Sequence, residues 1–230
     1  MEGIQSSGPV LSVRNLVKEY KEGARAVDGV SFEVKAGEIF GLLGPNGAGK
    51  TTIIRSISTI LSFTSGEIKV LGADNKKKPK EVRSSIGVLT TDIGAYDRFT
   101  GRENLKYFGE LYGMKKGELK KRIDELSELL DMKEFLDKRA GEYSTGMKQR
   151  LAIARSVIHD PAVIIFDEPT SGLDVLASQT VRNFMARSKK LGRAVIFSTH
   201  QMYDAEKLCD RVFVIHKGKM VAYDTVERIK

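Results

Sequence analysis

The most informative part of this sequence reads Gly44-Pro45-Asn46-Gly47-Ala48-Gly49-Lys50-Thr51. It follows G-x-x-x-x-G-K-[ST], a pattern typical of loops that hold phosphate groups between a strand and a helix. The neighbouring residues predict that context, with a short buried strand at 38–43 and a helix at 52–61. A chance glycine turn is the alternative, and it would arise in roughly one chain in a hundred of this length. The sequence therefore predicts a polyphosphate site, in which Lys50 reaches the outer phosphates and the Thr51 hydroxyl ligates Mg²⁺.

Length and composition indicate an ordinary globular chain. It has 230 residues, 41% of them apolar, enough for one large α/β domain or one domain with a subdomain. Its longest apolar runs, such as 162–166, are far too short to cross a bilayer. The polar, glycine-rich residues 1–9 do not resemble a secretory signal, and we expect a loose tail there. Cys209 is the single cysteine, which excludes an internal disulfide, favours a reducing cytosolic setting and predicts a packing role for this residue.

The charge balance is basic, with 38 Lys and Arg against 30 Asp and Glu and a formal net charge of +8. Such a charge suits nucleic acid, anionic lipid or nucleotide phosphates. The basic residues, however, are spread in short groups without the interleaved aromatic side chains that stack on bases. We therefore interpret them as solvated loops and helix faces, and we expect no nucleic-acid partner.

Periodicity predicts the order of elements along the chain. Residues from about 100 to 158 have a helical pattern without a strand, which begins with a capping box at Thr100-Gly101-Arg102-Glu103 and predicts a helical insertion. A charged loop is expected at 75–80. The remaining pattern predicts strands at 10–20, 26–34, 67–71, 86–89, 162–166, 194–198, 211–216 and 219–223, and helices at 151–158, 175–190, 203–209 and from 225 onward.

Two carboxylates end the apolar strand at 162–166. Ligands bind at the carboxyl ends of strands in an open parallel sheet, where Asp167 would hold Mg²⁺, directly or through water, and Glu168 would accept a proton from an attacking water. Acidic residues that only begin a loop are the alternative, and the phosphate loop in the same chain favours catalysis. His200 follows the strand at 194–198 and fits either a γ-phosphate contact or a structural hydrogen bond. The other histidines, His159 and His216, are interpreted as surface residues.

Two further residues fit either a local role or a ligand-binding role. Ser144 precedes the helix expected at 151–158, and an ordinary N-cap explains it from this segment alone. Its hydroxyl and the free N–H groups behind it would also bind an anion, which makes sense if two copies face each other and share one nucleotide. Tyr20 ends the first strand, where it either packs half-buried or stacks on a purine base.

Together these motifs resemble those of the ATP-binding subunit of ABC transporters, over nearly the whole chain. The Walker A loop spans 44–51, the signature 143–147, and Walker B 164–167, with Glu168 next; the D-loop spans 171–174, and the switch histidine is His200. Tyr20 lies where this family has its base-stacking aromatic residue. The amino-acid sequence at 87–92 and 96–98 is most similar to that of the sodium-efflux and multidrug exporter branch.

The resemblance implies an α/β fold: a P-loop NTPase core with a mainly parallel central sheet, an N-terminal antiparallel β subdomain and a helical subdomain at about 95–158, all within one domain at 1–230. It implies cofactors ATP and Mg²⁺ and the catalytic residues Lys50, Glu168 and His200, with Thr51, Asp167 and Asp92 at the metal. The nucleotide contacts that it implies are Tyr20, Gly44, Pro45, Asn46, Gly47, Ala48, Gly49, Lys50, Thr51, Thr52, Ser144 and Gly146.

The resemblance also implies partners and a mechanism. Two subunits pair head to tail, so that each ATP lies between one Walker A loop and the signature of the other copy. ATP closes the pair and hydrolysis opens it, and the motion passes to hydrophobic membrane permease subunits on separate chains. The expected partners are therefore these permeases and a second ATP-binding subunit, in a homodimer, and the expected location is cytoplasmic, at the inner face of the cell membrane.

The sequence departs from the family pattern at two places. Where the family usually has Gln after the strand at 86–89, this chain has Thr91 and Asp92; Asp92 would bind the metal through water but cannot donate as an amide does. The signature reads Tyr-Ser-Thr-Gly rather than Leu-Ser-Gly-Gly. Thr145 therefore adds a Cβ and a hydroxyl where backbone usually approaches the γ-phosphate. We expect an active enzyme that is slow on its own.

Two other classes of function compete with a transport ATPase. A soluble ABC-type ATPase acting on ribosomes, DNA or an assembly complex would share these motifs. Such proteins usually carry two ATPase domains in one chain or a long coiled-coil insertion, and this sequence has neither. A P-loop kinase or GTPase would not need the signature or the acidic pair, and the guanine-reading pattern N-K-x-D is absent from the sequence.

Overall fold

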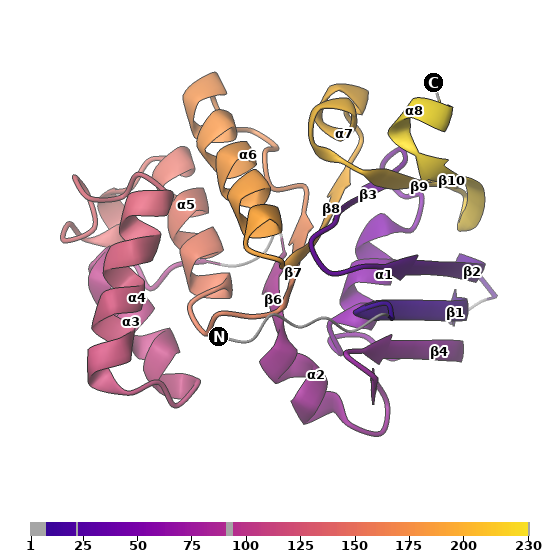
Figure 1. The fold of residues 1–230 in the computed structure, drawn as a ribbon, viewed down its shortest axis with the longest axis horizontal. Helices are drawn as coiled ribbons and strands as arrows, with labels where there is room; N and C mark the ends of the chain where they lie inside the picture. The colour runs from indigo at the N-terminus through magenta and orange to yellow at the C-terminus, as the bar shows by residue number, and fades with distance from the viewer. Residues whose placement is uncertain (1–7, 22, 91–93, 230) are drawn as a thin grey trace.

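The computed structural model describes residues 8–21, 23–90 and 94–229, which form two sheets and a group of helices (Figure 1). The smaller sheet has the strand order β2-β1-β4-β5, and each neighbouring pair is antiparallel. Its strands are β1 (Leu11–Glu19), β2 (Arg25–Val34), β4 (Ser65–Val70) and β5 (Ala73–Asp74).

The larger sheet has the strand order β10-β9-β3-β8-β7-β6. Its pairs are parallel except for β9 with β10, which form a hairpin. The strands are β3 (Ile39–Leu43), β6 (Ile86–Leu89), β7 (Val163–Asp167), β8 (Ala194–Thr199), β9 (Arg211–His216) and β10 (Lys219–Thr225). The predicted fold class, an α/β core with a mainly parallel sheet and an N-terminal antiparallel sheet, is confirmed.

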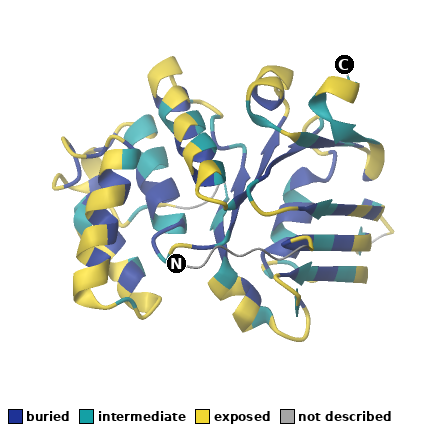
Figure 2. Cartoon of the chain, in the orientation of Figure 1, coloured by how far each residue is buried: buried dark blue, intermediate teal, exposed yellow. Residues whose placement is uncertain are grey.

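The larger sheet is covered on both faces, which explains its uninterrupted apolar strands. Every residue of β3, β7 and β8 is buried, as the dark blue strands in Figure 2 show. Successive residues of β7 alternate between two cores: Val163 and Ile165 pack with α1 and the antiparallel sheet, whereas Ile164 and Phe166 pack with α5 and α6. The carboxyl ends of these strands are thereby held in a rigid frame.

Helices, and no strand, fill the described chain between β6 and β7. They are α3 (Gly101–Leu111), α4 (Lys116–Leu129) and α5 (Thr145–Ser156), with a short 3₁₀ turn at Ala140–Glu142. They gather at the end of the molecule opposite the antiparallel sheet (Figure 1). The predicted capping box is present: Thr100 Oγ1 accepts from Glu103 N at 3.1 Å, and a Glu103 carboxylate oxygen accepts from Thr100 N at 2.8 Å.

Three of the predicted elements differ most from the structure. The helix expected at 52–61 is α1 (Lys50–Ile57), and the helix expected at 151–158 begins six residues earlier, at Thr145. The last two residues of the loop expected at 75–80 belong instead to α2 (Pro79–Ser85), because proline suits the first turn of a helix. The helix expected at 175–190 has those bounds in α6 (Val175–Lys190), and the last two are α7 (Met202–Leu208) and α8 (Val226–Ile229).

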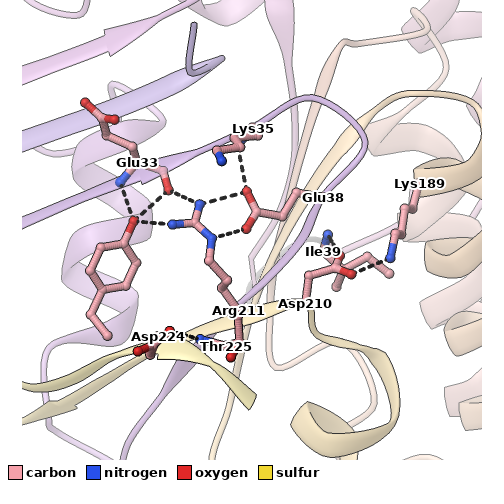
Figure 3. A network of polar contacts seen from close by, with 10 residues as sticks. Glu33, Lys35, Glu38, Ile39, Lys189, Asp210, Arg211, Asp224 and Thr225 are labelled. Atoms are coloured by element: carbon pink, nitrogen blue, oxygen red, sulfur yellow. Dashed lines mark hydrogen bonds and ion pairs between the residues drawn. The ribbon is translucent and has the colours of Figure 1, made fainter. Parts of the chain in front are cut away.

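Arg211 joins the two sheets through the polar network in Figure 3. Its guanidinium donates to both oxygens of Glu38, at 2.5 and 2.9 Å, and to the backbone oxygen of Glu33 at 2.8 Å. It also donates to the Tyr223 hydroxyl at 2.6 Å. The hydrogen bonds with the Glu38 carboxylate and its charge, followed by the contact with Tyr223, raise the pKa of Arg211. The antiparallel sheet is therefore tied to the core beside β3, the strand that leads into the glycine loop.

Candidate active site

The glycine loop connects β3 to α1 and packs closely against neighbouring backbone. A Cβ on Gly44 would lie 2.3 Å from the oxygen of Ile215. Gly49 has φ +115°, and a Cβ there would lie 2.5 Å from the oxygen of Ala26. Only glycine fits these two positions, because any side chain would collide with backbone. The loop delivers the chain directly into α1, so the first N–H groups of the helix point toward its concave side.

A cavity of about 360 Å³ lies over this loop. It brings together eight of the residues that the sequence predicted, from the loop, the first turn of α1 and the end of β7. Its lining residues are Ala26, Pro45, Asn46, Gly47, Gly49, Lys50, Thr51, Thr52 and Glu168. A second cavity, of about 480 Å³, includes His200 together with Gly44, Pro45 and Asn46 of the loop. The predicted phosphate loop, one acidic residue and the histidine are therefore neighbours.

Lys50 is buried and its ammonium lies at the centre of the site. Nζ donates to the backbone oxygen of Gly44 at 2.5 Å and to that of Pro45 at 3.2 Å. It also lies 3.3 Å from Glu168 Oε1. A compact cation on the concave side of a loop with inward N–H groups attracts phosphate.

Glu168 follows β7 in an unusual backbone conformation. Its φ is +51°, in the left-handed region, which costs a residue with a side chain about 1–2 kcal/mol. Surrounding contacts hold it there: its N–H donates to Ser198 Oγ at 3.0 Å, and its Oε2 lies 2.9 Å from Nδ1 of His200. Strained residues that their surroundings hold in place are typical of active sites.

Asp167 presents a carboxylate oxygen that fits a cation. The residue is 2% exposed, and its Oδ1 accepts from Ser198 Oγ at 2.5 Å. Oδ2 is buried and accepts no hydrogen bond from any residue that the structure describes. A hard oxygen of this kind suits Mg²⁺. Within the described ranges no group of three His, Cys, Asp or Glu residues is placed to hold a metal ion. Asp92, the third predicted metal ligand, lies outside the described residues, as does Thr91.

The signature residues occupy a different surface. Ser144 is exposed and caps α5, with Oγ accepting from Met147 N at 3.3 Å. Gly146 faces the start of α6, where a Cβ on it would lie 3.2 Å from Ala177 Cβ. The α6 N-cap is Asp174 of the D-loop, which accepts from Ala177 N at 2.8 Å. Neither Ser144 nor Gly146 lines the cavity over the glycine loop, so the signature and the D-loop adjoin each other but not that cavity.

Tyr20 also lies outside the lining of that cavity. It is 45% exposed, just after β1, and Lys18 Nζ lies 5.0 Å from the centre of its ring. The cavity residue on the neighbouring strand β2 is Ala26. The Tyr20 ring is therefore exposed enough to stack on a base, and it lies outside the cavity over the glycine loop.

Sequence reasoning missed Ser198, which binds both acidic residues. The register of β7 and β8 sets Asp167 opposite Ser198, and this pairing could not be derived from either strand alone. Ala26 was missed because nothing in its sequence surroundings marks it.

The prediction for His159 was wrong, whereas His216 is exposed as expected. His159 Nε2 lies 3.0 Å from the oxygen of Ile86, and its ring stacks on Tyr112 at 3.8 Å. Burial lowers the pKa of His159. Cys209 packs against the core as expected, and burial raises the pKa of its thiol.

A glycine loop, a buried lysine and paired acids at the carboxyl edge of a parallel sheet define a P-loop nucleoside triphosphatase. The profile of the family described as "ABC transporter" matches residues 27–171. The chain is 44% identical over 213 residues to the ABC transporter ATP-binding protein NatA of Bacillus subtilis, which covers 92% of this chain and 87% of the relative. It therefore belongs to the ABC transporter family, as an ATP-binding subunit that hydrolyses ATP.

Two further comparisons agree with this assignment. The linearmycin resistance ATP-binding protein LnrL of Bacillus subtilis is 38% identical over 216 residues, 94% of this chain and 69% of the relative. A solved structure described as the ATP-binding subunit of an ABC transporter superposes with a TM-score of 0.87 at 30% identity, covering 96% of this chain and 91% of that one. The comparisons give no support to a soluble ATPase of ribosomes or DNA.

ATP-binding subunits of this family work with membrane permeases and dimerise. In the part of the chain that the structure describes, no helix has the length and apolar character needed to span a membrane.

Proposed function

We propose that this chain hydrolyses ATP as a homodimer at the cytoplasmic face of the cell membrane and drives export of ions or drugs through separate permease subunits. The observation that carries this proposal is that the signature residues do not line the cavity over the glycine loop. The cavity over the glycine loop lacks Ser144 and Gly146 among its lining residues; Ser144 is exposed, and Gly146 is half-buried beside it. A second copy placed head to tail would bring them to the nucleotide.

Each predicted site residue would have its own role in ATP binding or hydrolysis. The loop N–H groups and Lys50 bind the phosphates, and Thr51 and Asp167 would hold Mg²⁺, which supplies charge neutralisation on the phosphates. Glu168 orients the attacking water and takes its proton. His200, hydrogen-bonded to Glu168, steadies that carboxylate and lies beside the γ-phosphate position. Tyr20 would stack on the adenine.

An exposed aromatic surface supports the proposed contact with a permease. Tyr96, Phe99 and Tyr107 are each at least 40% exposed, and their rings contact one another at 5.4–6.4 Å. Arg155 from α5 braces this surface by stacking on Phe108 at 4.6 Å and donating to the oxygen of Gly94. Contiguous exposed apolar groups mark interaction sites, and this one borders the loop at 94–98 between β6 and the helices.

Two observations support export as the direction of transport. Residues 87–92 and 96–98 resemble the sodium-efflux and multidrug exporter branch. LnrL carries resistance to linearmycin in its name, and removal of a compound from the cell is one route to resistance. We also infer that residues 1–230 are a single domain, in which 95–158 form a helical subdomain.

The decisive experiment uses Glu168→Gln, which removes the proposed base but keeps the shape of the side chain. We expect hydrolysis to fall by about 10²–10³-fold and ATP with Mg²⁺ to convert the monomer to a dimer in light scattering. ADP should leave it monomeric. Hydrolysis by Glu168→Gln at the wild-type rate would refute the base assignment, and a variant that stays monomeric in ATP would refute the shared site.

A further inference from the structure

Asp204 is a buried carboxylate for which ATP binding offers no explanation. It lies in the first turn of α7 and is 1% exposed. Its Oδ2 accepts from Thr170 Oγ1 at 2.9 Å, and its Oδ1 accepts from Arg182 Nε and Nη2 at 2.9 and 2.8 Å. It does not line either cavity at the glycine loop. A buried charge is costly unless each oxygen is paired, and here both are.

The two partners come from different elements. Arg182 is in the middle of α6, whereas Thr170 lies in the loop between β7 and α6, two residues after Glu168. Asp204 itself follows His200 by four residues. The carboxylate thus ties the segment that carries Glu168 to the segment that carries His200.

A second side-chain contact joins the same two segments at the cavity. There Glu168 Oε2 and His200 Nδ1 lie 2.9 Å apart, so the two segments are joined by side chains at two points. The backbone oxygen of Glu168 accepts from Ser171 N at 3.1 Å, which connects the turn around Thr170 back to Glu168. A shift of Thr170 would therefore be transmitted to a glutamate whose left-handed backbone already depends on its surroundings.

We propose that Asp204 is a positioning residue for ATP hydrolysis, which sets the distance between Glu168 and His200 by holding Thr170. The proposal rests on the proposed role of Glu168 as the base. Misplacement of a reacting group by a fraction of an ångström lowers the rate of the chemical step while leaving substrate binding intact.

The sharpest test is Thr170→Val, which removes one hydroxyl and keeps the shape. For the 230-residue chain we expect kcat to fall about tenfold, with KM for ATP unchanged within about twofold. Thr180→Val is the matched control, because the Thr180 hydroxyl donates only to the oxygen of Leu176 one turn earlier in α6. The control should keep the wild-type kcat.

Two Asp204 variants separate positioning from stability. Asp204→Ala removes both contacts and should lower kcat at least as much as Thr170→Val does. Asp204→Asn can accept from Arg182 and donate to Thr170, so it should restore most of kcat. Arg182→Met should lower the melting temperature while keeping kcat within about twofold at temperatures where it is folded, because the Thr170 contact remains.

Wild-type kcat in both Thr170→Val and Asp204→Ala, measured well below their melting temperatures, would overturn the proposal. A rise in KM with unchanged kcat would do the same, because it would assign Asp204 to nucleotide binding. These outcomes are distinct from failure of the proposed function, which Glu168→Gln tests separately. Should Asp204→Ala not fold, Thr170→Val alone decides.

Discussion

The Walker side of the site and the signature side are built in opposite ways. Lys50 and Asp167 are almost fully buried, and the contacts of Lys50, Asp167 and Glu168 come from β3, β7, β8 and the loops that follow them. Ser144 is exposed, and its described hydroxyl contact is the N-cap bond to Met147. One half of the site is therefore assembled within a single copy, whereas the other is a surface.

In the proposed mechanism, this difference would separate the residues that bind and hydrolyse ATP from the surface that closes over it. The Lys50–Glu168 ion pair and the Ser198 contacts with Asp167 and Glu168 hold these three side chains in place, so in the proposed mechanism little reorganisation would be needed during the reaction. An exposed helix N-terminus can approach or leave the phosphates as a rigid unit. The two halves are joined directly within one copy by a hydrogen bond: the Gln149 side chain of α5 donates to the backbone oxygen of Pro169, the residue after Glu168, at 2.9 Å.

Lys50→Ala should produce the largest effect, because it removes the only described cation inside the cavity over the loop. We expect kcat/KM to fall by about 10³-fold and nucleotide binding to be lost, measured by steady-state hydrolysis and by fluorescence of a labelled ATP. Lys133→Ala is a suitable control, because Lys133 is an exposed lysine paired with Glu128 at 3.5 Å. Normal turnover by Lys50→Ala would show that the Walker side does not bind the phosphates.

Ser144→Ala should have a smaller effect and one of a different kind. Loss of a hydrogen bond to a charged phosphate corresponds to about tenfold in kcat, whereas ATP binding to the monomer should not change. The same variant removes a helix cap, at a cost of about 1 kcal/mol.

Thr100→Ala is the matched control, because the Thr100 hydroxyl also accepts from the backbone N–H three residues later but lies outside the signature. Both variants should lose similar stability in thermal denaturation, and only Ser144→Ala should lose activity. An equal loss of activity in the two would reduce the role of Ser144 to capping.

The same contrast explains what could be predicted from the sequence. The Walker side depends on local patterns, a glycine loop and a strand that ends in two acids, and its strand and loop positions agree with the structure. The start of α5 was misplaced because residues 145–150 lack an apolar period; several of their contacts are polar or backbone contacts with Pro169, Asp131 and the start of α6. Ser198 and Asp204 act across strands and helices, through register and tertiary packing that no single segment contains.

The smallest expected effect concerns Thr145, the first residue of α5, whose exposed side chain lies on the surface where a second copy would meet the phosphates. Thr145→Gly would let backbone approach more closely, and we expect kcat to rise about twofold, a gain of roughly 0.4 kcal/mol in transition-state binding. The helix should lose up to about 0.5–1 kcal/mol of stability, because glycine is a poor helix residue. Thr145→Ser separates the methyl from the hydroxyl: a gain in both variants would identify the methyl as the obstacle. A fall in kcat for Thr145→Gly alone would instead show that the hydroxyl contacts the nucleotide, which would make the departure from the family signature a working part of the site.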